Sequence, residues 1–166
     1  RDPARPVPAD PLLLLAPADG TVTDIQTLST FPGFEGPVVR IGIFLSIFNV
    51  HINRMPCAVR VNKITYRPGK FSNAMNPDSG KTNECNELLL ERTEEPIQPL
   101  LLRQISGAVA RRIVCRAEEG QQWEAGSRFG MIKFGSRTEL IYPAGDRAGC
   151  RVKEGDKVKA GLSVLV

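Results

Sequence analysis

The sequence predicts a mainly β fold (β-rich α+β): a single compact domain of antiparallel strands, arranged as a flattened barrel or sandwich, with few short helices. Its 166 residues, 42% of them hydrophobic, can bury one substantial core, and nothing in the length requires a second domain. Short β-rich segments recur along the chain, and Gly, Pro, Asn or Asp separate most of them, as antiparallel strands joined by turns require. Only Gly107 to Arg111, in "ISGAVARRIV", has the composition of a helical turn.

The predicted elements follow an extended N-terminal arm. Arg1 to Pro11 carries four prolines and alternating charges, so this segment cannot join the middle of a sheet. The fold proper then begins near Leu12. The predicted strands are Gly20 to Thr27, Val38 to Phe48, Ala58 to Thr65, Glu87 to Glu91, Leu100 to Ile105, Arg112 to Ala117, Phe129 to Phe134, Thr138 to Tyr142 and Lys157 to Val166.

One long polar segment interrupts these strands. Arg67 to Asn86, "RPGKFSNAMNPDSGKTNECN", is twenty residues rich in Gly, Asn and Ser. A loop of this length is usually a functional lid or a disordered segment. The lid is the preferred interpretation.

Two stretches near the C-terminal end share a pattern, "GQQWEAG" at 120–126 and "GDKVKAG" at 155–161. Each is similar to the hairpins that build the flattened β-barrel of biotinyl and lipoyl carrier domains. This similarity supplies an alternative function, a non-catalytic carrier or ligand-binding β-domain. Lys133 is the nearest candidate for the acceptor lysine, but it stands between the bulky Ile132 and Phe134, whereas a carrier lysine lies between small residues or methionines.

The charge balance limits the partners. There are 22 basic and 18 acidic residues, a net charge of +4, which suits an anionic membrane surface or a nucleic acid. Aromatic residues are few and the basic residues are scattered, so we predict no nucleic-acid binding.

The longest apolar run, Leu12 to Ala16, is far shorter than the roughly 20 residues that span a bilayer. Because the chain opens on Arg1, we expect that an upstream segment has been lost, and any targeting segment with it.

The four cysteines are Cys57, Cys85, Cys115 and Cys150, and they are spaced too widely for a C-x-x-C zinc or redox motif. Two disulfides are one alternative. Free intracellular thiols, buried as small hydrophobic residues, are the preferred one.

An identical tripeptide occurs twice, as Gly126-Ser127-Arg128 and as Gly135-Ser136-Arg137. Glycine and serine both favour turns, glycine by permitting φ > 0 and serine through its hydroxyl. The tripeptide alone therefore does not show whether either serine has a chemical role.

Two further residues are candidates for chemistry. His51, in "FNVHINRMP", is the only histidine, and it is either a hydrogen-bonded structural residue or an acid–base group. A single histidine excludes a multi-His metal site and no compact Cys/His/Asp cluster replaces one, so no metal is predicted. Asp19, in "PADG", is first a turn signal. It also precedes a predicted strand, where catalytic carboxylates are often found.

Taken in order, these segments resemble the phosphatidylserine decarboxylase family over nearly the whole chain. The resemblance is carried by "RDPARPVP", "PADG", "FNVHINRMP", "GKFSNA", "NECNELLL", "QISGAVARRIVC" and "GSRFGMIKFGSRTELIYP". The last segment is the most specific, because in this family Phe-Gly-Ser or Leu-Gly-Ser at such a position is where the proenzyme cuts itself. The resemblance therefore selects Ser136 over Ser127.

The resemblance implies that Ser136 attacks the carbonyl of Gly135 and that the chain divides into 1–135 (β chain) and 136–166 (α chain). Ser136 would become a covalent pyruvoyl group, the electron sink for decarboxylation of phosphatidylserine to phosphatidylethanolamine. His51 would be the base and Asp19 would orient and charge-stabilise it. Long members of the family carry two histidines here, whereas this chain has Arg54 at the second place, a pattern similar to the short subclass.

The remaining implications concern binding. Arg54 and Lys70 are candidates for binding the substrate phosphate or carboxylate, although isolated cations of this kind more often only solvate a surface. The lipid substrate implies docking on an anionic membrane surface at the cytoplasmic face, as a peripheral protein or through a missing N-terminal segment. The resemblance further implies association of the two chains and a homo-oligomer.

Overall fold

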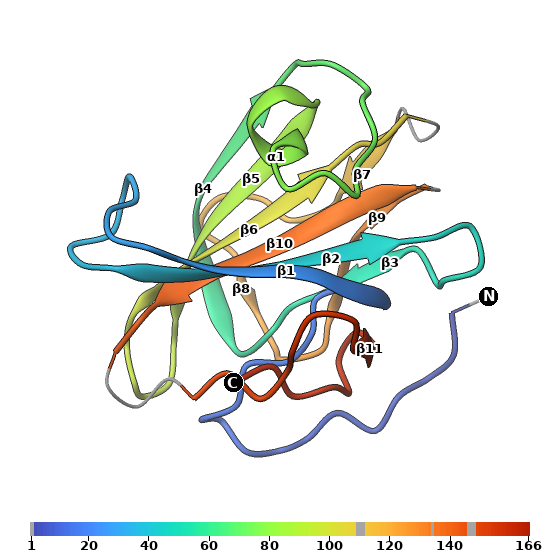
Figure 1. Ribbon diagram of the computed structural model, residues 1–166. Coiled ribbons are helices and arrows are strands. Elements are labelled where there is room, and N and C mark those ends of the chain that lie inside the picture. The colour runs from blue at the N-terminus through green and yellow to red at the C-terminus, as the bar shows by residue number, and fades with distance from the viewer. Residues whose placement is uncertain (1, 109–111, 134, 146–148) are drawn as a thin grey trace.

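Strands dominate the computed structural model, which describes residues 2–108, 112–133, 135–145 and 149–166 (Figure 1). Within these residues eleven strands form two antiparallel sheets. The large sheet has eight strands, in the order β11 (Lys157–Val158), β1 (Gly20–Leu28), β2 (Val38–Leu45), β10 (Ser136–Pro143), β6 (Pro99–Ile105), β5 (Cys85–Arg92), β4 (Val59–Arg67) and β8 (Gln122–Trp123). The small sheet has three, in the order β3 (Ile52–Arg54), β9 (Arg128–Ile132) and β7 (Ile113–Cys115).

The main core lies between the two sheets. Side chains of a strand alternate between its faces, so residues two apart share a face. On β10, Leu140 and Tyr142 face the main core together with Phe129 of the small sheet, while Ile141 faces a second, smaller cluster with Val38. The small sheet thus covers the inner face of the large one (Figure 1).

The outer face of the large sheet carries a buried network of charges next to the start of β10. Arg137 donates to both carboxylate oxygens of Asp24, at 2.6 and 2.8 Å, and to Glu139 at 2.9 Å. Arg137 and Glu139 are fully buried, and Arg103 donates to Glu139 at 3.2 Å. Burial alone would raise the pKa of Asp24, but the hydrogen bonds and charge of Arg137 outweigh it and hold that pKa below its ordinary value. This network fixes the residue that follows Ser136.

The predicted fold class is confirmed, but the large sheet is not closed into a barrel. Its edges are β11 and β8, and these two strands do not pair with each other. Of the two predicted arrangements, barrel or sandwich, the open sheet excludes the barrel. The two repeated stretches, 120–126 and 155–161, share a backbone feature. In each of them both glycines have positive φ, 88° and 76° for Gly120 and Gly126, and 92° and 73° for Gly155 and Gly161. The repeat therefore supplies an edge strand at either end of the sheet, with β8 on β4 and β11 on β1.

Most predicted strands are present with small shifts at their ends. Two predictions were too long: β2 ends at Leu45, because Ser46 to Asn49 form a turn, and β11 covers only Lys157–Val158. Strands β3 and β8 were not predicted. The predicted helical turn Gly107 to Arg111 lies largely outside the described residues.

The polar segment 67–86 is ordered where it covers the large sheet. It contains the short helix α1 (Ser79–Thr82). Asn83 is fully buried and donates to the carbonyls of Ser72 and Ser106, both at 2.8 Å. The segment therefore packs on the residues that follow β6, and its function as a lid stays a prediction.

All four cysteines are free thiols, as preferred from the sequence. Burial raises the pKa of Cys57 to about 11 and that of Cys85 to about 12. These two thiols are therefore protonated at neutral pH and pack as small hydrophobic residues.

Candidate functional site

The two serines of the repeated tripeptide have different surroundings. Ser127 is half-buried, and its hydroxyl donates to the carbonyl of Glu124 at 2.7 Å, closing a turn. Ser136 is fully buried, and its Oγ has no hydrogen-bond partner among the described residues. A buried hydroxyl without a partner costs about 1–3 kcal/mol and calls for an explanation. The structure therefore separates a turn serine from a buried serine whose hydroxyl has no partner among the described residues.

The peptide bond that precedes Ser136 is also unusual. Gly135 has φ +64°, in the left-handed region that favours glycine. Its carbonyl oxygen lies against Gly107, where an added Cβ would overlap it. The Gly107 backbone thus lies directly beside the carbonyl that Ser136 would attack.

Ser136 faces the interior of the molecule. It shares a face of β10 with Thr138, whose Oγ1 accepts from Asn53 Nδ2 at 3.2 Å. Gln104 donates to Asn53 Oδ1 at 3.0 Å, and Asn86 donates to Gln104 at 3.0 Å. A chain of buried amides therefore continues from the face that carries Ser136, inside an otherwise apolar core.

The pairing of β2 and β10 brings the turn that contacts His51 to the start of β10. Ser136 is the register partner of Leu45, and the carbonyl of the next residue, Ser46, is 3.0 Å from His51 Nε2. A carbonyl can only accept, so Nε2 is the donor in this hydrogen bond. The turn that ends β2 thus orients the only imidazole of the chain beside the start of β10.

Asp19 lies at the same end of the sheet, just before β1. Gly20 of β1 lies against the carbonyl of Phe44, next to the end of β2. The Asp19 carboxylate is buried, accepts from Arg5 at 2.5 and 2.8 Å, and accepts the backbone N–H of Ala160 at 2.8 Å. In the described contacts Asp19 therefore ties down the N-terminal arm, and the carbonyl of Ser46 is the acceptor for His51.

The two predicted substrate-binding cations differ in accessibility. Arg54 is 5% exposed, and its guanidinium donates to the carbonyls of Gly126 and Pro3 and to Asp2. Arg54 is therefore buried and holds the N-terminal arm through these contacts, and its binding of substrate stays a prediction. The side chain of Lys70 is exposed, on the segment that pairs with Asn83.

The site is thus built at one end of three neighbouring strands, where β1 starts, β2 ends and β10 starts (Figure 1). Sequence reasoning named Asp19, His51, Gly135 and Ser136 at this end. It missed Gly107 and the buried amides of Asn53, Asn86 and Gln104. An uncharged polar residue within a predicted strand, such as Gln104 in Leu100 to Ile105, was the signal that could have indicated the amides.

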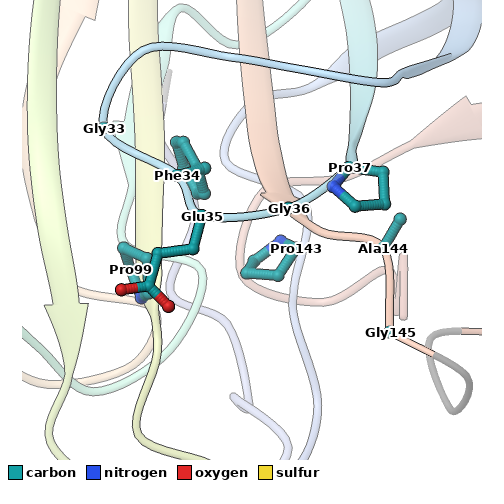
Figure 2. Close-up of a pocket in the computed structure, with 9 residues that line it drawn as sticks. All are labelled: Gly33, Phe34, Glu35, Gly36, Pro37, Pro99, Pro143, Ala144 and Gly145. Carbon is teal, nitrogen blue, oxygen red and sulfur yellow. The ribbon is translucent and has the colours of Figure 1, made fainter.

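A cavity of about 560 Å³ lies elsewhere (Figure 2). It is lined by Gly33 to Pro37, Pro99 and Pro143 to Gly145. Pro143 ends β10 and is seven residues from Ser136, which corresponds to roughly 23 Å along a strand. This cavity is therefore not part of the site at Ser136.

Known proteins of one family resemble this chain over its whole length. The profile of a family described as phosphatidylserine decarboxylase matches residues 1–166. A phosphatidylserine decarboxylase proenzyme of Rhodopirellula baltica is 44% identical over 165 residues, covering 99% of this chain and 68% of that protein. Proenzymes of the same name from Desulfotalea psychrophila and Gluconobacter oxydans are 42% and 45% identical, again over 99% of this chain and over 75% and 73% of their own lengths.

Among the described residues, no helix is long and apolar enough to cross a membrane. No group of three or more His, Cys, Asp or Glu side chains in that part of the chain is placed to hold a metal ion. The match of the family profile to the whole sequence and the identity to these relatives show that the chain belongs to the phosphatidylserine decarboxylase family.

Proposed function

We propose that this protein decarboxylates phosphatidylserine to phosphatidylethanolamine after cutting itself between Gly135 and Ser136. One observation carries the proposal: the Oγ of Ser136 is buried without a hydrogen-bond partner among the described residues, directly after a glycine with positive φ. Similar proteins named proenzymes of phosphatidylserine decarboxylase support both the substrate and the processing.

Self-cleavage uses only groups of the chain. Ser136 Oγ attacks the carbonyl carbon of Gly135 and loses its proton to a base; the C–N bond then breaks and an ester replaces the amide. Elimination across Cα and Cβ of residue 136 releases the carboxylate of Gly135 and leaves a dehydroalanine. Addition of water and loss of ammonia convert that residue into a pyruvoyl group. The left-handed backbone at Gly135 is one that glycine adopts without steric cost, so the residue before Ser136 can take this turn.

The surroundings of Ser136 fit such a group. The position is fully buried at the start of a strand, and its side chain lies on the face that Asn53 also contacts through Thr138. A pyruvoyl group there would supply a ketone that condenses with an amine and takes up the electrons released with CO₂. The buried surroundings exclude water and favour loss of charge from a carboxylate.

The two fragments are expected to stay together after cleavage. Strand β10 pairs with β2 along its whole length and with β6 from Arg137 to Ile141. The buried Arg137 side chain adds an ion pair with Asp24 of the first fragment, and Glu139 adds one with Arg103 of that fragment. We therefore propose that 1–135 and 136–166 form one domain whose reactive end is fixed by the sheet.

His51 is the proposed base for Ser136 and a proton donor in decarboxylation, with the Ser46 carbonyl orienting its ring. Asp19 is proposed to act in two ways: its negative charge acts on the site without a direct contact, and its hydrogen bonds hold Arg5 in place. Its oxygens accept from Arg5 and from the backbone N–H of Ala160.

Of the two cations, Lys70 is proposed to bind the substrate phosphate, because the guanidinium of Arg54 makes its contacts inside the protein. The partners we propose are an anionic membrane surface and further copies of the chain.

Replacing His51 by alanine is expected to slow self-cleavage, decarboxylation or both by about 10²-fold or more, the usual contribution of a positioned acid–base group. The rate of precursor loss on denaturing gels and CO₂ release from serine phospholipid measure the two steps separately. A variant that keeps both rates would remove His51 from the mechanism.

Intact mass spectrometry of the purified, unmutated protein tests the whole proposal. We expect two fragments, 1–135 and 136–166, with the smaller one lighter by one ammonia than a fragment that begins with serine, and reactive toward a hydrazide. Material that stays uncut in the presence of serine phospholipid, over a range of pH, would contradict the proposal.

The carrier alternative is less well supported. Lys133 is exposed, but it lies between β9 of the small sheet and β10 of the large sheet, and these strands pair with different partners. It is therefore not at the tip of a two-stranded hairpin, where a carrier lysine is presented. In the same mass spectrum, an added acyl group on Lys133 of an uncut chain would favour the carrier.

A further inference from the structure

Two apolar side chains project from the turn that ends β2. Phe48 is 90% exposed and Ile47 is 59% exposed. An isolated exposed apolar residue is common, but two large ones in succession at a turn are not explained by the core of this fold.

The turn that carries them is held by its own hydrogen bonds. The N–H of Asn49 donates to the Ser46 carbonyl at 3.1 Å, and the Ser46 N–H donates to Asn49 Oδ1 at 2.8 Å. Ile47 and Phe48 are therefore the two central residues of a closed turn. Their exposure is a property of a fixed conformation.

This turn lies at the end of the molecule where the peptide bond to be cut lies. Leu45, the residue before the turn, pairs with Ser136, and the Ser46 carbonyl meets His51. In Figure 1 the β2–β3 connection and the start of β10 lie at the same edge of the molecule. A third apolar side chain, Met75, is 53% exposed and follows Ala74, which lies near Gly107 beside Gly135. We call Ile47, Phe48 and Met75 the apolar rim.

Basic side chains accompany the apolar rim. Arg112 and Lys133 are both exposed and flank the paired residues Ile113 and Ile132 at the ends of β7 and β9. Lys70 is exposed at the start of the segment that carries Met75. Apolar side chains beside cations match the chemistry of an anionic bilayer, in which the apolar groups enter the acyl region and the cations meet the headgroups.

We propose that the apolar rim inserts into an anionic phospholipid bilayer and sets the Gly135–Ser136 end of the sheet against the lipid surface. This inference rests on the proposed function only in treating the Gly135–Ser136 end as the reactive end of the sheet. The docking itself does not depend on the proposed function. A second copy of the chain fits less well, because a stable protein interface buries about 800 Å² on each partner, far more than three side chains on two separate segments offer.

The test compares the unmutated chain with the double variant Ile47→Ser/Phe48→Ser. The matched control is Ile97→Ser, because Ile97 is 51% exposed in the β5–β6 turn, at the other end of the sheet from Ser136. Binding is measured by co-sedimentation with vesicles of phosphatidylglycerol and phosphatidylcholine, which contain no serine phospholipid. We expect the Kd of the double variant to rise roughly tenfold or more, with no change for Ile97→Ser.

Three outcomes would overturn the proposal. In the first two, the double variant binds vesicles as the parent does, or Ile97→Ser loses as much binding as the double variant. In the third, the oligomeric state of the double variant changes and its vesicle binding does not. Self-cleavage and turnover of a short-chain serine phospholipid below its micelle concentration are measured on the same preparations. If docking occurs through the apolar rim, the double variant keeps self-cleavage and turnover of the short-chain lipid. It loses only the turnover of lipid presented in vesicles. If the parent binds vesicles through the rim but never cuts itself, the docking stands and the proposed function fails.

Discussion

Ser136→Ala is expected to yield a single uncut chain without decarboxylase activity, whereas Ser127→Ala is cut normally. The two residues stand in the same tripeptide, so the local sequence is a matched control. Removing the nucleophile should lower the rate of cleavage by at least about 10³-fold, since no other hydroxyl takes its place in the attack on Gly135. Denaturing gels and intact mass after prolonged incubation give the measurement.

The stability of the same variant separates a chemical role from a structural one. Ser136 Oγ is buried and has no hydrogen-bond partner among the described residues, so its loss removes a desolvated polar group and breaks no hydrogen bond with them. We therefore expect Ser136→Ala to have a Tm equal to or above that of the uncut parent precursor. In contrast, Ser127→Ala loses the bond to the Glu124 carbonyl and should be slightly less stable, by about 0.5–1.5 kcal/mol. Cutting of Ser136→Ala together with an uncut Ser127→Ala would reverse the assignment.

The strands were predictable where their side chains follow the pattern of burial. In β5 and β6 the leucines make continuous apolar runs between polar turns, and both strands were found within two residues of their true ends. Strand β3 was missed because Ile52–Arg54 is short and two of its three residues are polar, although Asn53 and Arg54 are buried by contacts with distant parts of the chain. Local composition carries no information about such contacts.

The residues of the candidate site could be named from the sequence, but their geometry could not. The repeated Gly-Ser-Arg gave two candidates, and a resemblance chose Ser136; the structure supplies the physical difference between them through burial and hydrogen bonding. The pairing of Asp19 with Arg5 joins residues 14 apart through the N-terminal arm, which the sequence represented only as an extended segment. The proximity of Gly107 to Gly135 depends on β6 and β10 being neighbours, and sheet order cannot be read from strand patterns.

Gly107→Ala is expected to slow self-cleavage strongly while Gly36→Ala does not. An added Cβ at Gly107 would overlap the carbonyl oxygen of Gly135 and would also press on Ala74, whereas a Cβ at Gly36 meets nothing within 4 Å. Both glycines have φ outside the positive range, so the substitutions differ in space and not in backbone strain. A displacement of about 1 Å in a reacting group can cost about 10²-fold in rate, and we expect a loss of that size.

Two readouts keep this prediction falsifiable. The overlap should also destabilise the precursor by about 1–3 kcal/mol, as overpacking usually does, so folding is checked by far-UV circular dichroism and Tm before rates are compared. A folded Gly107→Ala protein that cuts at the parent rate would show that the backbone beside the Gly135 carbonyl is not needed for the attack. If the folded variant instead stays uncut while Gly36→Ala matures, then the position of that carbonyl, and not only the presence of Ser136, limits the conversion of precursor to enzyme.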